Sequence, residues 1–261
     1  MTVKVGIAGL GAIGSAVANA LTSDSGIEGY HLECLSELNS VDNYHVDNVD
    51  FETLMNRCDL VVECLPADIV PELVEKAFDT RTDVILISSA ALLIYPQIVD
   101  MHQAAQSKIY LPSGALSGID GVRAMKEMGI TEAKIASTKP PLGFGGAPYI
   151  QQNDIDLSAI EQKTLLFEGN ALEAAKGFPA NINVAATLSI AGIGGEKTRV
   201  EIWADPTTKN NKHEITVKSE FSTLTSTIEN MPDPKNPKSS VLAAQSIVAT
   251  LKNMHSAVVL T

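Results

Sequence analysis

The stretch that decides the fold is residues 3–14, VKVGIAGLGAIG. Residues 3–8 form a short run of apolar and β-branched side chains that ends in a glycine turn, and residues 12–21 carry apolar side chains at helical spacing. Between the two, Gly9, Gly11 and Gly14 fit the pattern G-x-G-x-x-G in a strand–turn–helix context. The first glycine permits the tight turn, the second lets the backbone approach a pyrophosphate, and the third allows close packing of helix on strand. The stretch therefore predicts a dinucleotide-binding turn, with the pyrophosphate at a helix N-terminus.

The sequence that follows, up to residue 111, repeats the alternation of strand and helix. Its strand-like runs lack polar alternation, as expected where helices cover both faces of a sheet. Strands that alternate with helical segments are typical of βαβ units. We therefore predict an α/β fold with a Rossmann-type, doubly wound parallel sheet. The expected strands are residues 30–35, 60–65, 84–88 and 109–111, and the expected helices include residues 68–78 and 95–107.

The character of the chain changes at residues 112–121, PSGALSGIDG, which suit a hinge or a ligand-facing loop. We place the domain boundary here. A dinucleotide-binding domain is expected to contain residues 1–111 plus a returning helix in residues 238–261, and a second α/β domain with a mixed sheet, for substrate and dimerisation, to contain residues 112–237.

Within the second domain the expected strands are residues 134–138, 164–168, 199–204, 214–220 and 222–228, and the expected helices are residues 171–176 and 183–193. Residues 140–154 are rich in proline and glycine and are expected to form a long loop. Residues 231–237, MPDPKNP, contain three prolines and are expected to be an irregular connector.

Composition excludes several classes of partner. The 261 residues carry 19 Lys and Arg against 31 Asp and Glu, a net charge of −12, which argues against nucleic acid. There is no apolar run of about 18 residues, the length that a membrane span needs. The three cysteines form neither a disulfide framework nor a metal-binding pair, so we expect a cytoplasmic protein without a metal.

The adenosine ribose of a dinucleotide is usually held by an acidic residue at the end of the second strand. Glu37 is the candidate, with Glu33 and Ser36 as neighbouring alternatives. No Arg or Lys occurs between Gly14 and Arg57, so a clamp for a 2′-phosphate is not visible and NAD is favoured over NADP.

The loops that follow the strands are expected to line the cofactor, because ligands of such sheets lie outside the carboxyl ends of the strands. This places Cys64 and Leu65 beside it. No His or Lys at telling spacing would activate Cys64, so we interpret it as a small buried thiol and not a nucleophile.

Among five histidines, His213 has the setting of a catalytic group. It follows an exposed polar run and enters a predicted strand, so its imidazole can face a cleft from a rigid support. The others are interpreted as structural or solvated; they are His31, His45, His102 and His255.

The whole chain resembles the L-aspartate dehydrogenase family. The resemblance rests on GLGAIG at 9–14, LPSGALSGIDG at 111–121, FPANINVAATLSIAGIG at 178–194 and ADPTTKNNKHEI at 204–215. It implies that His213 is the active-site histidine, that Ala115 and Asn183 contact the nicotinamide cofactor, and that Ala12 and Ile13 lie on the phosphate turn.

The resemblance also implies the reaction: NAD(P)-dependent oxidation of aspartate to iminosuccinate, which hydrolyses to oxaloacetate and ammonia or supplies pyridine nucleotide biosynthesis. His213 either exchanges a proton with the amine or a water, or holds a substrate carboxylate when it is protonated. A dicarboxylate needs counter-charge, and the nearest plausible donors are Lys139, Asn211 and Lys212.

Several details stay open at this level. Asp205 either orients His213 or forms an Asx turn before Pro206, and Asn183 with Asn181 either caps a helix or contacts the cofactor. The segments Glu63–Pro66 and Ser88–Ser89 depart from the pattern that we associate with the family.

Two other functions are compatible with the sequence. One is a related two-domain reductase such as dihydrodipicolinate reductase, although the His-His-x-x-Lys stretch of such an enzyme is missing beside residues 112–115. The other is an NAD(H) sensor without turnover. The expected active site is a cleft between the two domains of a homodimeric enzyme.

Overall fold

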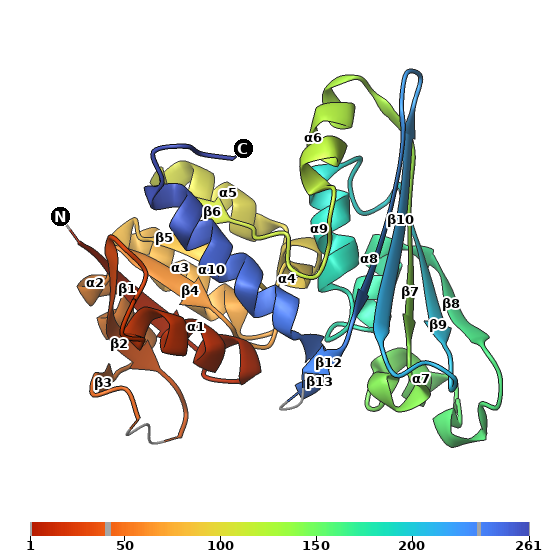
Figure 1. Cartoon of the computed structure of the whole chain (residues 1–261), viewed down its shortest axis with the longest axis horizontal. Coiled ribbons are helices and arrows are strands. Elements are labelled where there is room, and N and C mark those ends of the chain that lie inside the picture. Colours follow the sequence, from red (N-terminus) through yellow and green to blue (C-terminus); the bar gives the residue numbers. More distant parts are fainter. Residues whose placement is uncertain (1, 40–42, 234–235, 261) are drawn as a thin grey trace. The chain divides into compact units, whose positions relative to one another are not determined.

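The computed structural model describes residues 2–39, 43–233 and 236–260, and it divides into two compact units (Figure 1). The first unit consists of Met1–Gly114 and Leu242–Thr261, and the second of Ala115–Val241. Within the described residues, no helix has the length and apolar character that crossing a membrane would require.

The first unit is built on a parallel sheet in the order β3-β2-β1-β4-β5-β6. From β1 to β3 the chain adds strands on one side of β1, and from β4 onwards it adds them on the other side. The carboxyl ends of β1 and β4 therefore flank the switch point where doubly wound sheets bind dinucleotides. The predicted Rossmann-type sheet is confirmed. Its strands are β1 (Val3–Ala8), β2 (Tyr30–Ser36), β3 (Asp47–Asn48), β4 (Leu60–Glu63), β5 (Asp83–Leu86) and β6 (Ile109–Tyr110).

Helices cover both faces of this sheet, which explains why its strands are apolar throughout. Residues of α1 (Ala12–Thr22) and α10 (Val241–His255) share one buried cluster with the strands, and α2 (Phe51–Arg57), α3 (Val70–Thr80) and α5 (Gln97–Ala105) pack on the opposite face (Figure 1). A short helix, α4 (Ala90–Ile94), precedes α5. The central strands contribute fully buried side chains, each worth about 1.5–3 kcal/mol; they include Val5, Ile7, Val62 and Ile85.

The second unit contains a mixed sheet in the order β11-β10-β7-β9-β8, in which only β7 and β9 are parallel. Three helices cover one of its faces (Figure 1): α6 (Ile119–Glu127), α8 (Ala171–Gly177) and α9 (Asn183–Ala191). The strands are β7 (Ile130–Lys139), β8 (Thr164–Asn170), β9 (Thr198–Ala204), β10 (Asn211–Ser219) and β11 (Thr223–Asn230).

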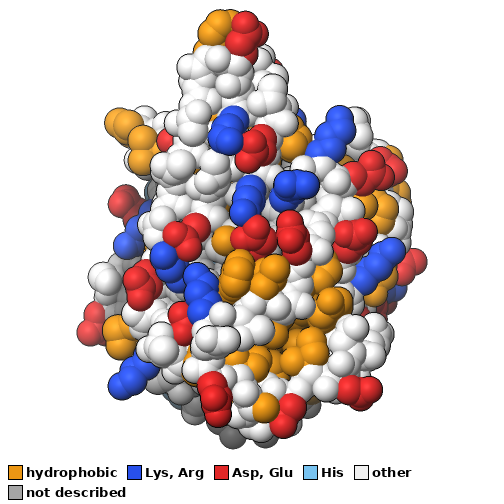
Figure 2. All heavy atoms as spheres, turned by 90° about the vertical axis from the view of Figure 1, so that its right-hand side faces the viewer, with side chains coloured by type: hydrophobic (Ala, Val, Ile, Leu, Met, Phe, Trp, Pro, Cys, Tyr) orange, Lys and Arg blue, Asp and Glu red, His pale blue; other side chains and the backbone are white. Residues whose placement is uncertain are grey.

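On the other face of the mixed sheet, called the open face below, most side chains of β7, β9 and β10 are partly or fully exposed. Figure 2 shows this face, on which charged side chains surround an area of apolar ones. Alternation along β10 separates the two faces: Asn211, His213 and Ile215 are buried, whereas Lys212 and Glu214 are partly exposed and form an ion pair.

Several expected boundaries were wrong. The expected irregular connector at residues 231–237 contains paired strands, since β12 (Pro232–Asp233) pairs with β13 (Asn236–Ser240); residues 234–235 of the range lie outside the described residues. A short two-stranded ribbon tolerates proline at its edges, where no ladder hydrogen bond is lost. The expected loop 140–154 contains helical turns at η1 (Pro141–Phe144) and α7 (Pro148–Gln152), followed by η2 (Leu157–Ala159). The expected helix 95–107 is α5, and α4 lies immediately before it.

Candidate active site

The glycine turn between β1 and α1 leaves no room for side chains at two of its positions. Gly9 has a φ of +88°, and a Cβ there would lie 2.6 Å from the Cys64 carbonyl oxygen. A Cβ on Gly14 would collide with the Gly9 carbonyl oxygen. The Gly9 N–H donates to the Ser36 carbonyl at 2.9 Å, which fixes the turn against the end of β2. Both glycines are therefore required by the fold of the turn itself.

Gly11 differs, because a Cβ there would meet no atom within 4 Å. Gly11 is the N-cap of α1, no side chain of the described residues caps this helix, and Ala12 and Ile13 follow as its first residues. The backbone N–H groups of this first turn are thus available to an anion. Open space at Gly11 beside uncapped N–H groups fits a dinucleotide pyrophosphate.

The Glu37 carboxylate lies at the same turn. Its Oε2 accepts from the Leu10 N–H at 2.7 Å, and its Oε1 accepts from the Leu38 N–H at 2.8 Å. The alternative Glu33 instead accepts from Arg57 at 3.0 Å, and Ser36 belongs to β2, where its carbonyl serves the turn. Glu37 is thus the candidate whose side chain hydrogen-bonds to the glycine turn, whereas Ser36 contacts the turn through its backbone carbonyl.

Sequence reasoning missed the part that Glu63 plays at the carboxyl ends of β4 and β5. Its carboxylate is fully buried and accepts from the backbone N–H groups of Leu65 at 2.5 Å, Ile87 at 3.1 Å and Ser88 at 3.0 Å. Burial raises the pKa of Glu63 to about 7, although these N–H groups and the Ser88 hydroxyl favour the carboxylate. A carboxylate inside the apolar run LVVECL was the available signal. Glu63 ties together the loops that we expect to line the cofactor.

Cys64 and Leu65 border the glycine turn. The Cys64 N–H donates to the Ala8 carbonyl at 2.8 Å, and a Cβ on Gly9 would lie 3.1 Å from Leu65 Cδ2. Burial, and secondarily the charge of Glu63, raises the pKa of the Cys64 thiol well above its usual range. A thiol with this pKa is protonated, which agrees with its interpretation as a packing residue.

In the second unit, His213 lies in the interior of β10 and is only 4% exposed. Antiparallel pairing sets it opposite Ser137 of β7, and the Ser137 hydroxyl lies 2.9 Å from His213 Nδ1. Burial, together with the positive charge of Lys139, lowers the pKa of His213 to about 3. The imidazole is therefore neutral at physiological pH, and Ser137 fixes its orientation.

Lys139 shares this buried face of the sheet, two residues beyond Ser137 on β7. It is 4% exposed, and its Nζ donates to Asn181 Oδ1 at 3.1 Å. Asn211, the first residue of β10, is also buried on this face. The fold thus gathers a lysine, an imidazole, a hydroxyl and two amides among apolar side chains. Burial of polar groups costs free energy unless they are hydrogen-bonded, so such a cluster is a candidate functional site.

Lys212 does not join this cluster. Its side chain lies on the open face of the sheet and pairs with Glu214 at 2.9 Å, because neighbouring residues of a strand point to opposite faces. Asp205 does not orient His213 either. Its carboxylate accepts from the Thr207 N–H at 2.9 Å, so the Asx-turn alternative is the correct one.

Asn183 is the first residue of α9, and Ala115 is a buried residue at the start of the second unit. The N-cap of α9 is Ile182, and within the described residues no side chain caps the helix, which argues against the capping role considered for Asn181 and Asn183. The Asn181 amide serves Lys139 instead.

The remaining histidines have structural surroundings. The His31 ring contacts Glu33 at 3.2 Å, His102 is buried with its Nδ1 2.9 Å from the Ser107 hydroxyl, and the His255 ring packs edge-on against Tyr30. His45 lies in a bend with a φ of +54°. In the part of the chain that the structure describes, no group of three or more His, Cys, Asp or Glu residues is placed to hold a metal ion.

Comparison with known proteins gives two family matches that together span almost the whole chain. Residues 9–112 match the NAD-binding domain of homoserine dehydrogenase, and residues 120–254 match the C-terminal domain of aspartate dehydrogenase. The L-aspartate dehydrogenase of Methanosarcina barkeri is 39% identical, over 98% of both chains. This chain belongs to the aspartate dehydrogenase family.

Other members agree with this assignment. L-aspartate dehydrogenase 3 of Bordetella bronchiseptica is 40% identical over 97% of this chain and 96% of its own. The crystal structure of aspartate dehydrogenase from Thermotoga maritima covers 100% of both chains with a TM-score of 0.78 and 26% identity. The family resemblance inferred from the sequence is thereby confirmed, and so is its assignment to the NAD-binding dehydrogenases.

Proposed function

We propose that this protein oxidises L-aspartate to iminosuccinate with a nicotinamide dinucleotide, and that the imine hydrolyses to oxaloacetate and ammonia or supplies pyridine nucleotide biosynthesis. One observation carries the proposal: a neutral, buried His213 oriented by Ser137 and accompanied by a buried Lys139, in a chain of the aspartate dehydrogenase family. An amino acid dehydrogenase needs both a group that exchanges protons and a cation for its carboxylates.

The dinucleotide is assigned to the first unit. The glycine turn with Ala12 and Ile13 would hold its pyrophosphate, Glu37 its adenosine ribose, and Cys64 and Leu65 would border it, while Ala115 and Asn183 are assigned to its nicotinamide end. When bound, the nicotinamide takes up the hydride that leaves Cα of the substrate. The reaction requires a hydride acceptor and a group that exchanges protons; we assign the acceptor to the dinucleotide of the first unit and the proton exchange to His213.

The chemistry of the second unit favours one of the two roles considered for His213. A histidine with a pKa of about 3 carries no charge, so it does not attract a carboxylate as a cation. Lys139 is the buried cation of this face, and we assign the substrate carboxylate to it, with Asn211 as a further donor. His213 is left to exchange a proton with the substrate amine or a water, because the amine must be neutral before the imine forms.

A carboxylate that binds Lys139 also changes the imidazole. It offsets the positive charge that holds down the pKa of His213, and it therefore raises the proton affinity of the ring when substrate is present. On this proposal the ring becomes a better base only after the dicarboxylate has bound.

The test is to follow NADH absorbance with purified protein across L-aspartate, D-aspartate, glutamate, alanine, and oxaloacetate plus ammonium. We expect turnover with L-aspartate and, in reverse, with oxaloacetate plus ammonium. His213→Ala is expected to keep NADH binding and to lose turnover by orders of magnitude. Turnover of a different acid alone would contradict the substrate assignment, and NADH binding without turnover of any of them would identify a sensor.

We further propose that NAD is preferred over NADP. The Glu37 carboxylate sits at the turn where a 2′-phosphate would have to approach, and like charges repel. Glu37→Gln is expected to lower the ratio of kcat/KM for NAD to that for NADP. An unchanged ratio would remove Glu37 from the ribose site.

We also propose a cytoplasmic homodimer that associates through the open face of the mixed sheet. Support comes from Leu165 and Trp203, which are paired on adjacent strands, and from Leu165 being 38% exposed. Leu165→Lys is expected to yield monomers in light scattering, whereas Phe221→Ser, at an exposed apolar residue between β10 and β11, keeps the dimer. A wild-type monomer would contradict this.

A further inference from the structure

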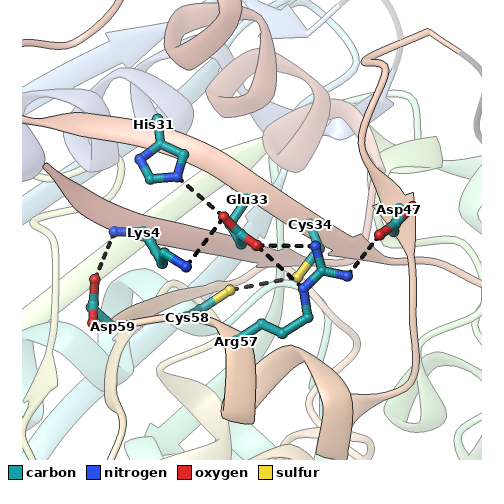
Figure 3. A network of polar contacts seen from close by, with 8 residues as sticks. All are labelled: Lys4, His31, Glu33, Cys34, Asp47, Arg57, Cys58 and Asp59. Carbon is teal, nitrogen blue, oxygen red and sulfur yellow. Dashed lines mark hydrogen bonds and ion pairs between the residues drawn. The ribbon is translucent and has the colours of Figure 1, made fainter.

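The first unit contains a network of reactive side chains that the proposed mechanism does not use (Figure 3). Its hub is Glu33, and beside it lie two thiols, Cys34 and Cys58, whose Sγ atoms lie 3.5 Å apart. Both are buried, and both are free. Cys34 lies on β2 and Cys58 is the C-cap of α2, so the contact joins two elements that are 24 residues apart in the sequence.

An irregularity in β2 accounts for this meeting. The pairing of β1 with β2 skips Glu33 just before Gly6 pairs with Cys34, so Glu33 is the extra residue of a β-bulge. A bulge redirects side chains that would otherwise alternate between the two faces. As a result, the consecutive residues Glu33 and Cys34 contact the consecutive residues Arg57 and Cys58 (Figure 3).

The surroundings favour thiolate chemistry at this pair. Gly6 leaves room for the sulfur, because a Cβ there would lie 2.8 Å from Cys58 Sγ. Arg57 also donates to Asp47 of β3 at 2.7 Å, which holds the end of α2 against the strands. The hydrogen bond from the Cys58 thiol lowers the pKa of Cys34, and the charge of Arg57 adds to this effect, whereas burial and the charges of Glu33 and Asp47 oppose it. The thiolate is the form that reacts with oxidants.

We propose that Cys34 and Cys58 are a redox-modification site, in which a hydroperoxide converts the two thiols into a disulfide that weakens dinucleotide binding. One thiolate attacks the O–O bond and becomes a sulfenic acid, while hydroxide or alkoxide leaves and is protonated. The second sulfur then displaces water from the sulfenic acid and forms the S–S bond. The two sulfurs lose two electrons, the peroxide gains them, and a dithiol reverses the change.

The route from the disulfide to the cofactor runs along β2. Bond formation brings the sulfurs from 3.5 Å to about 2.05 Å, and in this proposal a shift of β2 takes up part of the change. Two residues beyond Cys34, the Ser36 carbonyl accepts from the Gly9 N–H, and Glu37 then accepts from the Leu10 N–H. Movement of β2 therefore disturbs both hydrogen bonds that position the glycine turn.

The experiment treats the reduced full-length protein with hydrogen peroxide and then titrates NADH by fluorescence. Peptide mapping is expected to find Cys34 linked to Cys58. The Kd for NADH is expected to rise by about threefold to tenfold, as expected when the two hydrogen bonds are weakened by an amount that together equals the loss of one. Dithiothreitol is expected to restore the original affinity.

Cys58→Ser is the matched control, and Cys34→Ser repeats it from the other side. Neither residue touches the glycine turn, so both variants are expected to bind NADH with the Kd of the reduced wild type. Peroxide is expected to leave that Kd unchanged. Three results would overturn the proposal: no link between the two cysteines, a link without loss of affinity, or the same loss in Cys58→Ser. The last result would assign the effect to oxidation elsewhere, for example at Cys64.

Discussion

The imidazole of His213 is expected to stay neutral far below the pH at which an exposed histidine titrates. Its pKa is lowered from 6.5 to about 3 by burial and by Lys139. A histidine held neutral in the folded state binds its proton readily only after unfolding, so protons favour the unfolded chain. The stabilisation is fully present above pH 6.5 and is lost as the pH falls towards 3.

The size of the effect follows from the shift. Each pH unit below 6.5 lowers the free energy of unfolding by about 1.4 kcal/mol. The contribution of His213 to that free energy therefore falls by roughly 2 kcal/mol between about pH 7 and pH 5. His213→Asn removes the titration and keeps a polar group opposite Ser137. The variant carries a fixed cost of its own, which cancels when its stability is compared at the two pH values.

Two measurements check this prediction. An NMR titration of the ring protons is expected to show no protonation of His213 above about pH 5 in the folded protein. In urea unfolding, the free energy of unfolding of the second unit is compared between wild type and His213→Asn. The difference in favour of wild type is expected to decrease by roughly 2 kcal/mol from pH 7 to pH 5. A ring that titrates near 6.5, or an advantage independent of pH, would refute the electrostatic account of the site.

Three further predictions concern the turn, the imidazole and the buried carboxylate. Gly11→Val is expected to fold normally and to weaken NADH binding at least about tenfold, whereas Gly14→Ala lowers Tm because its Cβ meets the backbone; calorimetry and NADH titration separate the two. Ser137→Ala is expected to lower kcat about tenfold with NADH affinity unchanged, and Ser137→Thr to restore it. For Glu63, whose pKa is raised to about 7, the stability of wild type relative to Glu63→Gln is expected to fall by roughly 3 kcal/mol from pH 4.5 to pH 7 in urea unfolding.

The fold was predictable where short-range pattern decides it. The apolar strands and the glycine turn of the first unit follow from residues 3–14 and from the alternation after them. Prediction failed where pairing with a distant or edge segment decides. Residues 231–237 looked irregular because proline lacks an N–H, yet a ribbon of two short strands does not need every ladder hydrogen bond.

The site was predictable residue by residue only in part. The prediction that His213 lies on a strand is confirmed, and β10 contains the signal for its burial, since it shares a face with Ile215 and Val217. Its partner Ser137 was missed, because the two residues are 76 positions apart and only the register of β7 against β10 brings them together. Lys212 was an incorrect candidate for the same reason: its position in the strand sends it to the opposite face.

The two buried titratable groups act on different units with opposite signs. Glu63 belongs to the first unit and favours folding more as the pH falls from 7 to 4.5, whereas His213 belongs to the second unit and favours folding less as the pH falls below 6.5. Over pH 4.5–6.5 the two contributions to the free energy of unfolding nearly cancel in the whole chain. The pH dependence of the total free energy therefore reveals neither of them. They do not cancel within either unit. Mild acid therefore weakens the unit that holds the imidazole and strengthens the one that holds the glycine turn, so loss of turnover is expected to precede loss of NADH binding.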